Sequence, residues 1–352
     1  MVYDPFEMAI ATEELSTAYM GLTDEQRSMS EVCEVMEDLH TSLEFISKFG
    51  QTGVDVLNAS EGIAALLRSH NRSTIVNVDT AKESFTEAAK LAWNKFVEIV
   101  KKIWAWIKTV IHNFLVMVTG ARQHNQEFLT FLAQIDSKEF VRAMQNAKAT
   151  STEAIAIAEA FANRNIVSYD CALKLVEQAA FVDSFSTASF REDLDEYIQL
   201  INDHPEKIAD EIKKLEERIA ALDTEIEQCR ATFNKYLEQG SEEGKNASDY
   251  LSIGWDTDEK IRRFMNIWDE THSKLEKELS ALDACKPTFD KMVVAATGKL
   301  DPNGEYFAAG GRLLQMVSQL YAKETKELAT EGSNITMVLV KCREALRRAF
   351  NK

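Results

Sequence analysis

Proline and glycine are scarce in this chain, whose 352 residues include only four prolines and thirteen glycines. Such a composition leaves few places where a helix must end or a tight turn must form. Alternating runs of β-branched residues are also nearly absent, and the best strand candidate is the short stretch 73–78 (STIVNV). Because 45% of the residues are apolar, a sizeable core can form. We therefore expect an all-α protein, organised as a multi-helix bundle.

Paired cysteines are also missing. The five cysteines are odd in number, widely scattered and never spaced as Cys-x-x-Cys. This arrangement is typical of reduced thiols in a cytosolic setting rather than of a disulfide framework. The first twenty residues are acidic and lack a basic start followed by an apolar run, so we expect no secretory signal peptide.

Sequence motifs that would identify an enzyme are absent. The chain has no phosphate-binding glycine loop, no nucleophile elbow and no HExxH. Glu37-x-x-His40 and Asp269-x-x-His272 resemble halves of a di-iron site, but such a site needs two ExxH motifs and two further glutamates. We interpret these histidines as surface residues of acidic helices. We expect a protein that is not an enzyme and that holds no cofactor or metal.

Positive charge is concentrated in one short stretch. The whole chain has a net charge of −17. Residues 1–79 carry fourteen acidic and four basic side chains, a net of −10, whereas residues 90–108 carry five lysines and one glutamate, a net of +4. The overall balance argues against direct nucleic-acid binding, which needs a dense basic surface. The basic stretch is instead expected to meet the acidic segment 1–79, within one molecule or between two.

That basic stretch belongs to an amphipathic helix predicted over residues 81–120, which Asp79 or Thr80 would cap and Gly120 would end. Its apolar arc and its borders contain the candidate membrane or partner face: Trp93, Phe96, Ile103, Trp104, Trp106, Ile107 and Phe114. Lys95, Lys101, Lys102 and Lys108 lie beside this arc.

Two interpretations of the 81–120 helix remain open. A wide apolar face suits a helix packed in a core, and it also suits a helix lying in an anionic membrane interface. A membrane-spanning helix is disfavoured because Lys108, His112 and Asn113 interrupt the most apolar window. We expect Phe96, Ile103, Ile107 and Phe114 to be covered by protein, with the acidic helices of residues 1–79 as the cover, because so wide an apolar face would otherwise be an exposed patch.

The remaining helices are predicted from apolar spacing and breakers. We expect helices at 5–20, cut off by Gly21, at 31–48, ended by Gly50, and at 54–68. Residues 122–203 are expected to form four or five short helices. After residue 287 we expect helices at 288–297, 305–330 and 334–349, the last capped by Ser333.

The most regular pattern is a coiled-coil seam between Ile208 and Tyr236, with apolar residues at alternating spacings of four and three. It predicts a long antiparallel coiled-coil hairpin in which 206–239, ended by Gly240, packs against 257–285. Ile212, Leu215, Ile219 and Leu222 would face the second helix. A parallel dimer through the same seam is the alternative. The expected organisation is 1–79 acidic helical segment, 80–203 amphipathic helix and short-helix bundle, 204–286 hairpin and 287–352 C-terminal helices packing on the bundle.

The acidic start followed by the stretch FTEAAKLAWNKFVEIVKKIWAWIK resembles the internal head proteins of large tailed bacteriophages. This resemblance implies a virion protein packaged in the capsid interior, delivered to the host cytoplasm with the DNA and bound to other virion or host proteins, for which the hairpin is the expected contact surface. It also implies trimming by a prohead protease after a small residue, any residue and glutamate. Ala11-Thr12-Glu13 fits that rule, with cleavage after Glu13, and Ala329-Thr330-Glu331 fits it as well.

Three functions therefore stay open. The first is a non-catalytic virion protein. The second is a membrane-active protein similar to α-helical pore-forming toxins, against which the expected short helices of the first half argue. The third is an intracellular scaffold or adaptor that binds partners through the hairpin.

Overall fold

The computed structural model describes residues 5–58, 77–147, 166–177, 187–299 and 306–350. Within these ranges the chain consists of helices and short connections and contains no strand. The expected all-α multi-helix bundle is confirmed. Its elements are α1 (Pro5–Phe49), α2 (Gln51–Asn58), α4 (Val78–Leu132), α5 (Ser137–Asn146), α7 (Tyr169–Glu177), α9 (Thr187–Asp203), the 3₁₀ helix η1 (Pro205–Lys207), α10 (Ile208–Asn246), α11 (Asp258–Ala284), α12 (Lys286–Lys299) and α13 (Phe307–Phe350).

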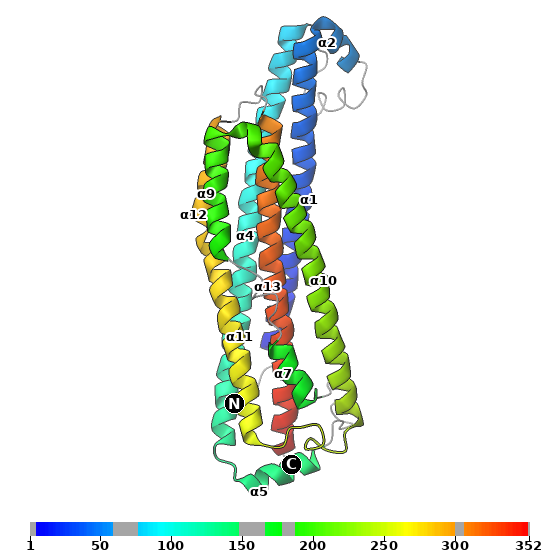
Figure 1. Cartoon of the computed structure of the whole chain (residues 1–352), viewed down its shortest axis with the longest axis vertical. Helices are drawn as coiled ribbons and strands as arrows, with labels where there is room; N and C mark the ends of the chain where they lie inside the picture. Colours follow the sequence, from blue (N-terminus) through cyan, green and yellow to red (C-terminus); the bar gives the residue numbers. More distant parts are fainter. Residues whose placement is uncertain (1–4, 59–76, 148–165, 178–186, 300–305, 351–352) are drawn as a thin grey trace.

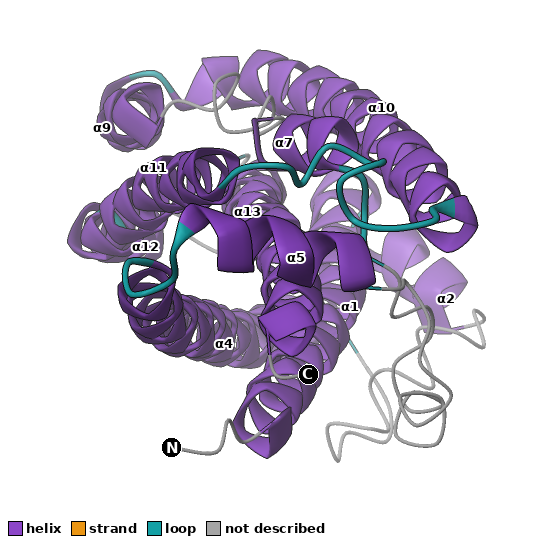
Figure 2. Cartoon of the chain, turned by 90° about the horizontal axis from the view of Figure 1, so that it is seen from below, coloured by secondary structure: helices purple, strands orange, loops and turns teal. Residues whose placement is uncertain are grey.

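The molecule is elongated because its longest helices lie side by side along one axis (Figure 1). Helix α13 runs through the middle, with α4, α1, α10 and α11 packed around it (Figures 1 and 2). Most of its residues are buried, including the polar Glu324, Thr336 and Arg343. A helix that is buried on all sides is the core of a bundle. At one end, α1, α2 and the start of α4 extend beyond the other helices (Figure 1).

Helices α1 and α4 form the most extensive helix pair of the bundle and run in opposite directions (Figure 1). The expected break at Gly21 is wrong, because α1 is continuous from Pro5 to Phe49. A Cβ atom at Gly21 would collide with the indole ring of Trp106 on α4. Gly21 therefore permits close helix packing rather than a turn. The turn comes at Gly50, whose φ of 55° is in the left-handed region that favours glycine.

Helix α4 is longer than expected at both ends. Asn77 caps its start, with the side chain accepting a hydrogen bond from the Thr80 backbone N–H at 2.9 Å. Val78 is thus helical rather than part of a strand, and residues 59–76, which include most of the strand candidate and the end of the helix expected at 54–68, lie outside the described residues. Gly120 does not end the helix, which continues to Leu132. Nothing lies within 4 Å of a Cβ placed at Gly120.

The C-terminal helices show the same lengthening. The helices expected at 305–330 and 334–349 are one helix, α13, in which Ser333 donates to the Ala329 carbonyl instead of capping a new helix. Gly332 lies where α13 approaches Phe114 of α4 and Leu275 of α11. Of the short helices expected in 122–203, residues 122–132 continue α4, and α5, α7 and α9 are observed. The alanine-rich stretch 148–165 lies outside the described residues.

The expected hairpin is wrong in its packing. Helices α10 and α11 are long and run in opposite directions (Figure 1), but α10 packs mainly on α13 and α7, and α11 packs on α13, α7 and α4. Helix α10 also continues past Gly240 to Asn246, because Gly240 and Gly244 let it approach residues 166–171.

Helix α13 is therefore the parallel partner of α10. Four ion pairs join α10 to α13: Glu216–Arg312, Asp223–Lys323, Arg218–Glu324 and Arg230–Glu327. From the first pair to the last, the contact advances toward the C-terminus of both helices, as a parallel pair requires. Along the seam, Leu215 and Leu222 are buried whereas Ile212 and Ile219 are only partly buried. The seam predicted a coiled-coil contact, but not which helix would provide it.

Buried side chains from helices throughout the chain belong to one continuous apolar cluster. Cys33, Cys171, Cys285 and Cys342 are buried, Cys229 is partly buried, and all five are free thiols, as the sequence predicted. The division into 1–79, 80–203, 204–286 and 287–352 remains a prediction about the order of parts along the chain.

Candidate functional site

The apolar face of α4 is covered along its length. Phe96, Ile103, Ile107 and Phe114 have no exposed surface. The acidic helix α1 is the main cover, with α13 and α11 completing it. The expectation that protein covers this face, and that residues 1–79 supply much of the cover, is confirmed. The face is part of the bundle core in this conformation.

The three tryptophans at the borders of this face contact other helices. The indole N–H of Trp93 donates to Thr297 Oγ1 of α12 at 3.2 Å. The Trp104 ring lies against Phe289 and Tyr321, with centroids 5.4 and 4.8 Å away. Trp106 is only partly buried and lies over Gly21 of α1. In this conformation the tryptophans join α4 to its neighbours.

The lysines of α4 remain on the outside. Lys95 and Lys101 are exposed. Lys102 Nζ lies 3.4 Å from Glu25 of α1, and Lys108 Nζ lies 4.0 Å from Asp283 of α11. Both of these lysine side chains are more than half exposed, at 61% and 53%, so each ion pair stabilises the fold only weakly.

Within the described residues, α4 is the helix that contains an 18-residue window long and apolar enough to cross a membrane, with 44% of that window buried. The criterion uses length and composition only, and the core helix of a soluble bundle satisfies it too. The packing of α4 under α1 agrees with the core interpretation for this conformation.

The two tripeptides that fit the prohead-protease rule differ in accessibility. Ala11-Thr12-Glu13 lies near the start of α1, where Glu13 is exposed and Leu15 is buried. Ala329-Thr330-Glu331 lies inside α13, and Ala329 has no exposed surface. A protease needs an extended segment, which the end of a helix supplies at much lower cost than the middle of a core helix. The fold therefore favours cleavage after Glu13.

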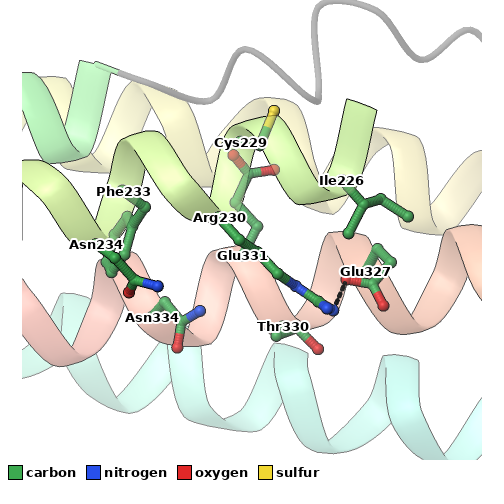
Figure 3. A pocket seen from close by; sticks show the side chains of 9 residues that line it. All are labelled: Ile226, Cys229, Arg230, Phe233, Asn234, Glu327, Thr330, Glu331 and Asn334. Carbon is green, nitrogen blue, oxygen red and sulfur yellow. Dashed lines mark hydrogen bonds and ion pairs between the residues drawn. The ribbon is translucent and has the colours of Figure 1, made fainter. Parts of the chain in front are cut away.

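A groove of about 510 Å³, counted with the open solvent inside it, lies between α10 and α13 (Figure 3). Arg230 reaches across it to Glu327, and the remaining lining residues are Ile226, Cys229, Phe233, Asn234, Thr330, Glu331 and Asn334. Burial raises the pKa of Cys229, so the thiol stays protonated and is a poor nucleophile. The groove combines one ion pair with amides and apolar carbons, and this arrangement does not define a reaction.

A charged cluster lies where α9, α10 and α13 meet, with Glu324 buried and Arg218 and Asp193 partly exposed. Arg218 of α10 donates to Asp193 of α9 at 2.6 Å and lies 3.7 Å from Glu324 of α13. Burial raises the pKa of Glu324 to about 8, although Arg218 acts in the opposite direction. Its Oε2 atom has no hydrogen-bond partner among the described residues. Glu324 is therefore mostly protonated at neutral pH, and Arg218 is balanced mainly by Asp193.

The interpretation of His40 and His272 as surface residues is wrong. Only 8% of His40 is exposed, and His272 is fully buried. The Nδ1 atom of His272 lies 3.0 Å from the Trp268 carbonyl oxygen, and its Nε2 atom lies 2.7 Å from the Thr336 hydroxyl. Burial lowers its pKa to about 4, so the imidazole is neutral and joins α11 to α13. Over the described residues, no group of His, Cys, Asp and Glu is arranged to hold a metal ion.

Sequence reasoning missed the buried Glu324 and Arg343 and the partly buried Arg122. Arg122 of α4 donates to both carboxylate oxygens of Glu276 on α11 at 2.6 and 2.7 Å. Arg343 donates to the Ala121 carbonyl at 3.1 Å and to Asn125 Oδ1 at 2.9 Å. Glu324 could have been noticed, because it continues the helical spacing of the buried Val317, Leu320 and Leu328. No comparable signal exists for the two arginines.

In comparisons with known protein families, characterised proteins and solved structures, nothing matches this chain.

Proposed function

We propose that this chain is a non-catalytic virion protein of a large tailed bacteriophage, packaged inside the head and delivered with the DNA. The observation that carries the proposal is the position of Glu13. The tripeptide that fits the prohead-protease rule lies near the beginning of α1, and its glutamate, Glu13, is exposed. Trimming there keeps residues 14–49 of α1, which include its buried residues from Leu15 to Ile46.

The use of charged residues in the fold also supports a structural role. Arg122 joins α4 to α11 through Asp269 and Glu276. Arg218 joins α10 to α9 and α13. These groups are engaged in holding long helices together, which suits a rigid, elongated component.

Mass spectrometry of purified particles tests this function. The chain should be present in the particles, and its first residue there should be Glu14. Glu13→Ala should abolish trimming while the chain is still packaged. The matched control, Glu331→Ala, changes the competing tripeptide and should leave trimming after Glu13 unchanged. Absence of the chain from the particles would refute the proposal, and an untrimmed chain in mature particles would remove its main support.

A membrane-active role is the second candidate, and one observation favours it. The first half of the chain contains long helices instead of the short ones expected, because α1 and α4 span 45 and 55 residues. Withdrawal of α1 would expose Phe96, Ile103 and Ile107, with the lysines placed for anionic headgroups.

Quenching of tryptophan fluorescence by brominated anionic lipids tests this second candidate. A shift in emission is less informative, because four of the five tryptophans are already buried. Carbodiimide coupling of Lys102 to Glu25, whose charged atoms are 3.4 Å apart, would hold α1 on α4 and should prevent quenching. Equal quenching with and without this link would show that α4 does not have to open. No quenching of the unlinked chain at low salt would exclude the membrane role.

A further inference from the structure

The register of α1 against α4 is defined by two contacts. Gly21 lies against Trp106, and Glu25 pairs with Lys102 at 3.4 Å. A step of four residues forward on α1 therefore corresponds to four residues backward on α4. By continuation of this register, Glu34 is level with residue 93 and Glu37 is level with Lys90.

A row of lysines occupies the solvent side of α4. Lys90, Lys95 and Lys101 are exposed, and with Lys102 and Lys108 they extend over ~27 Å of helix. Lys102 and Lys108 approach carboxylates of α1 and α11. Among the described residues, no acidic side chain lies within the 4.0 Å ion-pair distance of Lys90, Lys95 or Lys101.

A row of acids occupies the solvent side of α1 at the same level. Glu31, Glu34, Glu37 and Asp38 are exposed, and the register places them beside residues 89–96 of α4. The two neighbouring helices thus present opposite charges at equal height. An exposed apolar side chain lies at this level, because Leu91 on α4 is 54% exposed.

We propose that this α1–α4 face binds a second copy of the same chain. A twofold axis parallel to the two helices places α1 of one copy opposite α4 of the other and preserves height along the helices. Glu34 and Glu37 of each copy then lie opposite Lys90 and Lys95 of the other. Such an isologous interface requires one patch that carries both charges at matching levels, and the α1–α4 register supplies it.

The arrangement favours a second copy over a membrane or nucleic acid. A polyanion that approached the lysine row would also meet the acidic row on α1 beside it, and the chain as a whole has a net charge of −17. A second copy instead presents lysines to these acids. The inference is independent of the proposed function, because it depends only on the exposed sides of α1 and α4.

Sedimentation of the full chain over a range of concentrations tests the proposal. At low salt, the chain should form dimers. At about 0.5 M salt the dimers should dissociate, because the Debye length is then shorter than the ~8 Å of physiological solution. Lys90→Glu with Lys95→Glu should raise the dissociation constant roughly tenfold or more, because like charges then face each other. Glu34→Lys with Glu37→Lys should do the same.

Combining all four substitutions in one chain provides the decisive measurement, because it restores opposite charges across the twofold axis and should restore the dimer. A merely destabilised fold would not be rescued in this way. The control, Lys213→Glu with Lys235→Glu, makes the same change in net charge on exposed positions of α10 and should leave the dimer intact. A monomer at every concentration, a dimer insensitive to the α1 and α4 changes, or failure of the combined variant to dimerise would overturn the proposal.

Discussion

Glu324 makes the stability of the bundle depend on pH. It is buried in the central helix, and its pKa is about 8 instead of the ordinary 4.5. Between pH 4.5 and about 8, the folded chain therefore keeps a proton on Glu324 that the unfolded chain has already released. Stability is consequently greatest at low pH for this group, falls as the pH rises from 4.5 to about 8, and changes little above that.

Glu324→Gln replaces the carboxyl group with an uncharged amide of the same shape. The pKa difference between 4.5 and about 8 sets an upper limit of ~5 kcal/mol on the gain in unfolding free energy, at 1.36 kcal/mol for each pH unit. This limit already includes the attraction of Arg218, 3.7 Å away, which lowers the pKa of Glu324. We expect the variant to equal the wild type at acid pH and to be several kcal/mol more stable at alkaline pH.

Denaturant unfolding followed by circular dichroism at acid, neutral and alkaline pH measures this difference. The wild-type transition midpoint should fall between neutral and alkaline pH more steeply than that of the variant. If both proteins lose stability in parallel over this range, Glu324 is ionised in the folded bundle and our account of the α9–α10–α13 cluster is incorrect. Glu327→Gln is a matched control on the same helix, where the carboxylate pairs with Arg230, and it should not stabilise the chain.

Three further predictions concern helix contacts. Gly332→Ala should destabilise the chain by about 1–3 kcal/mol in thermal unfolding, because the added Cβ meets the Phe114 ring. Gly120→Ala should instead stabilise it by about 0.5–1 kcal/mol, because nothing lies within 4 Å of the added Cβ. His272 should protonate near pH 4 in an NMR titration of the folded chain. Its contribution to stability should be lost as the pH falls from 6.5 through about 4. Protonation near pH 6.5 in the folded chain would contradict the burial of His272. Arg122→Met should lower the denaturation free energy by about 1–2 kcal/mol, and an unchanged midpoint would show that the α4–α11 contact holds without the guanidinium group.

Helix breakers were the least reliable part of the sequence interpretation. Gly21, Gly120 and Gly240 each predicted the end of a helix, yet all three lie inside helices. At Gly21 and Gly240 a side chain of another helix occupies the space that a Cβ would need. The sequence alone does not distinguish a glycine that ends a helix from a glycine that makes room for a neighbouring side chain. The difference depends on a side chain that belongs to another part of the chain.

The candidate face on α4 could be predicted because it depends on local periodicity. The spacing of Phe96, Ile103, Ile107 and Phe114 places them on one side of a helix, and an apolar side must be covered in water. The acidic character of residues 1–79 indicated which segment would provide the cover. Burial of Glu324 and His272 could not be predicted in the same way, because desolvation depends on helices distant in sequence.

The sequence by itself determined that the chain is helical, which sides of its helices are apolar, and that α4 combines an apolar face with a row of lysines, because all three follow from the order of residues at helical spacing. Only the tertiary structure decided that α13 is the central helix, that α10 packs on α13 instead of α11, and that opposite charges on α1 and α4 stand at the same height. The apolar stripe of one helix can pack against that of any other helix of suitable length. The choice among them depends on how side chains such as Trp106 and Phe114 fit against Gly21 and Gly332, and on the closure of all the helices around one core.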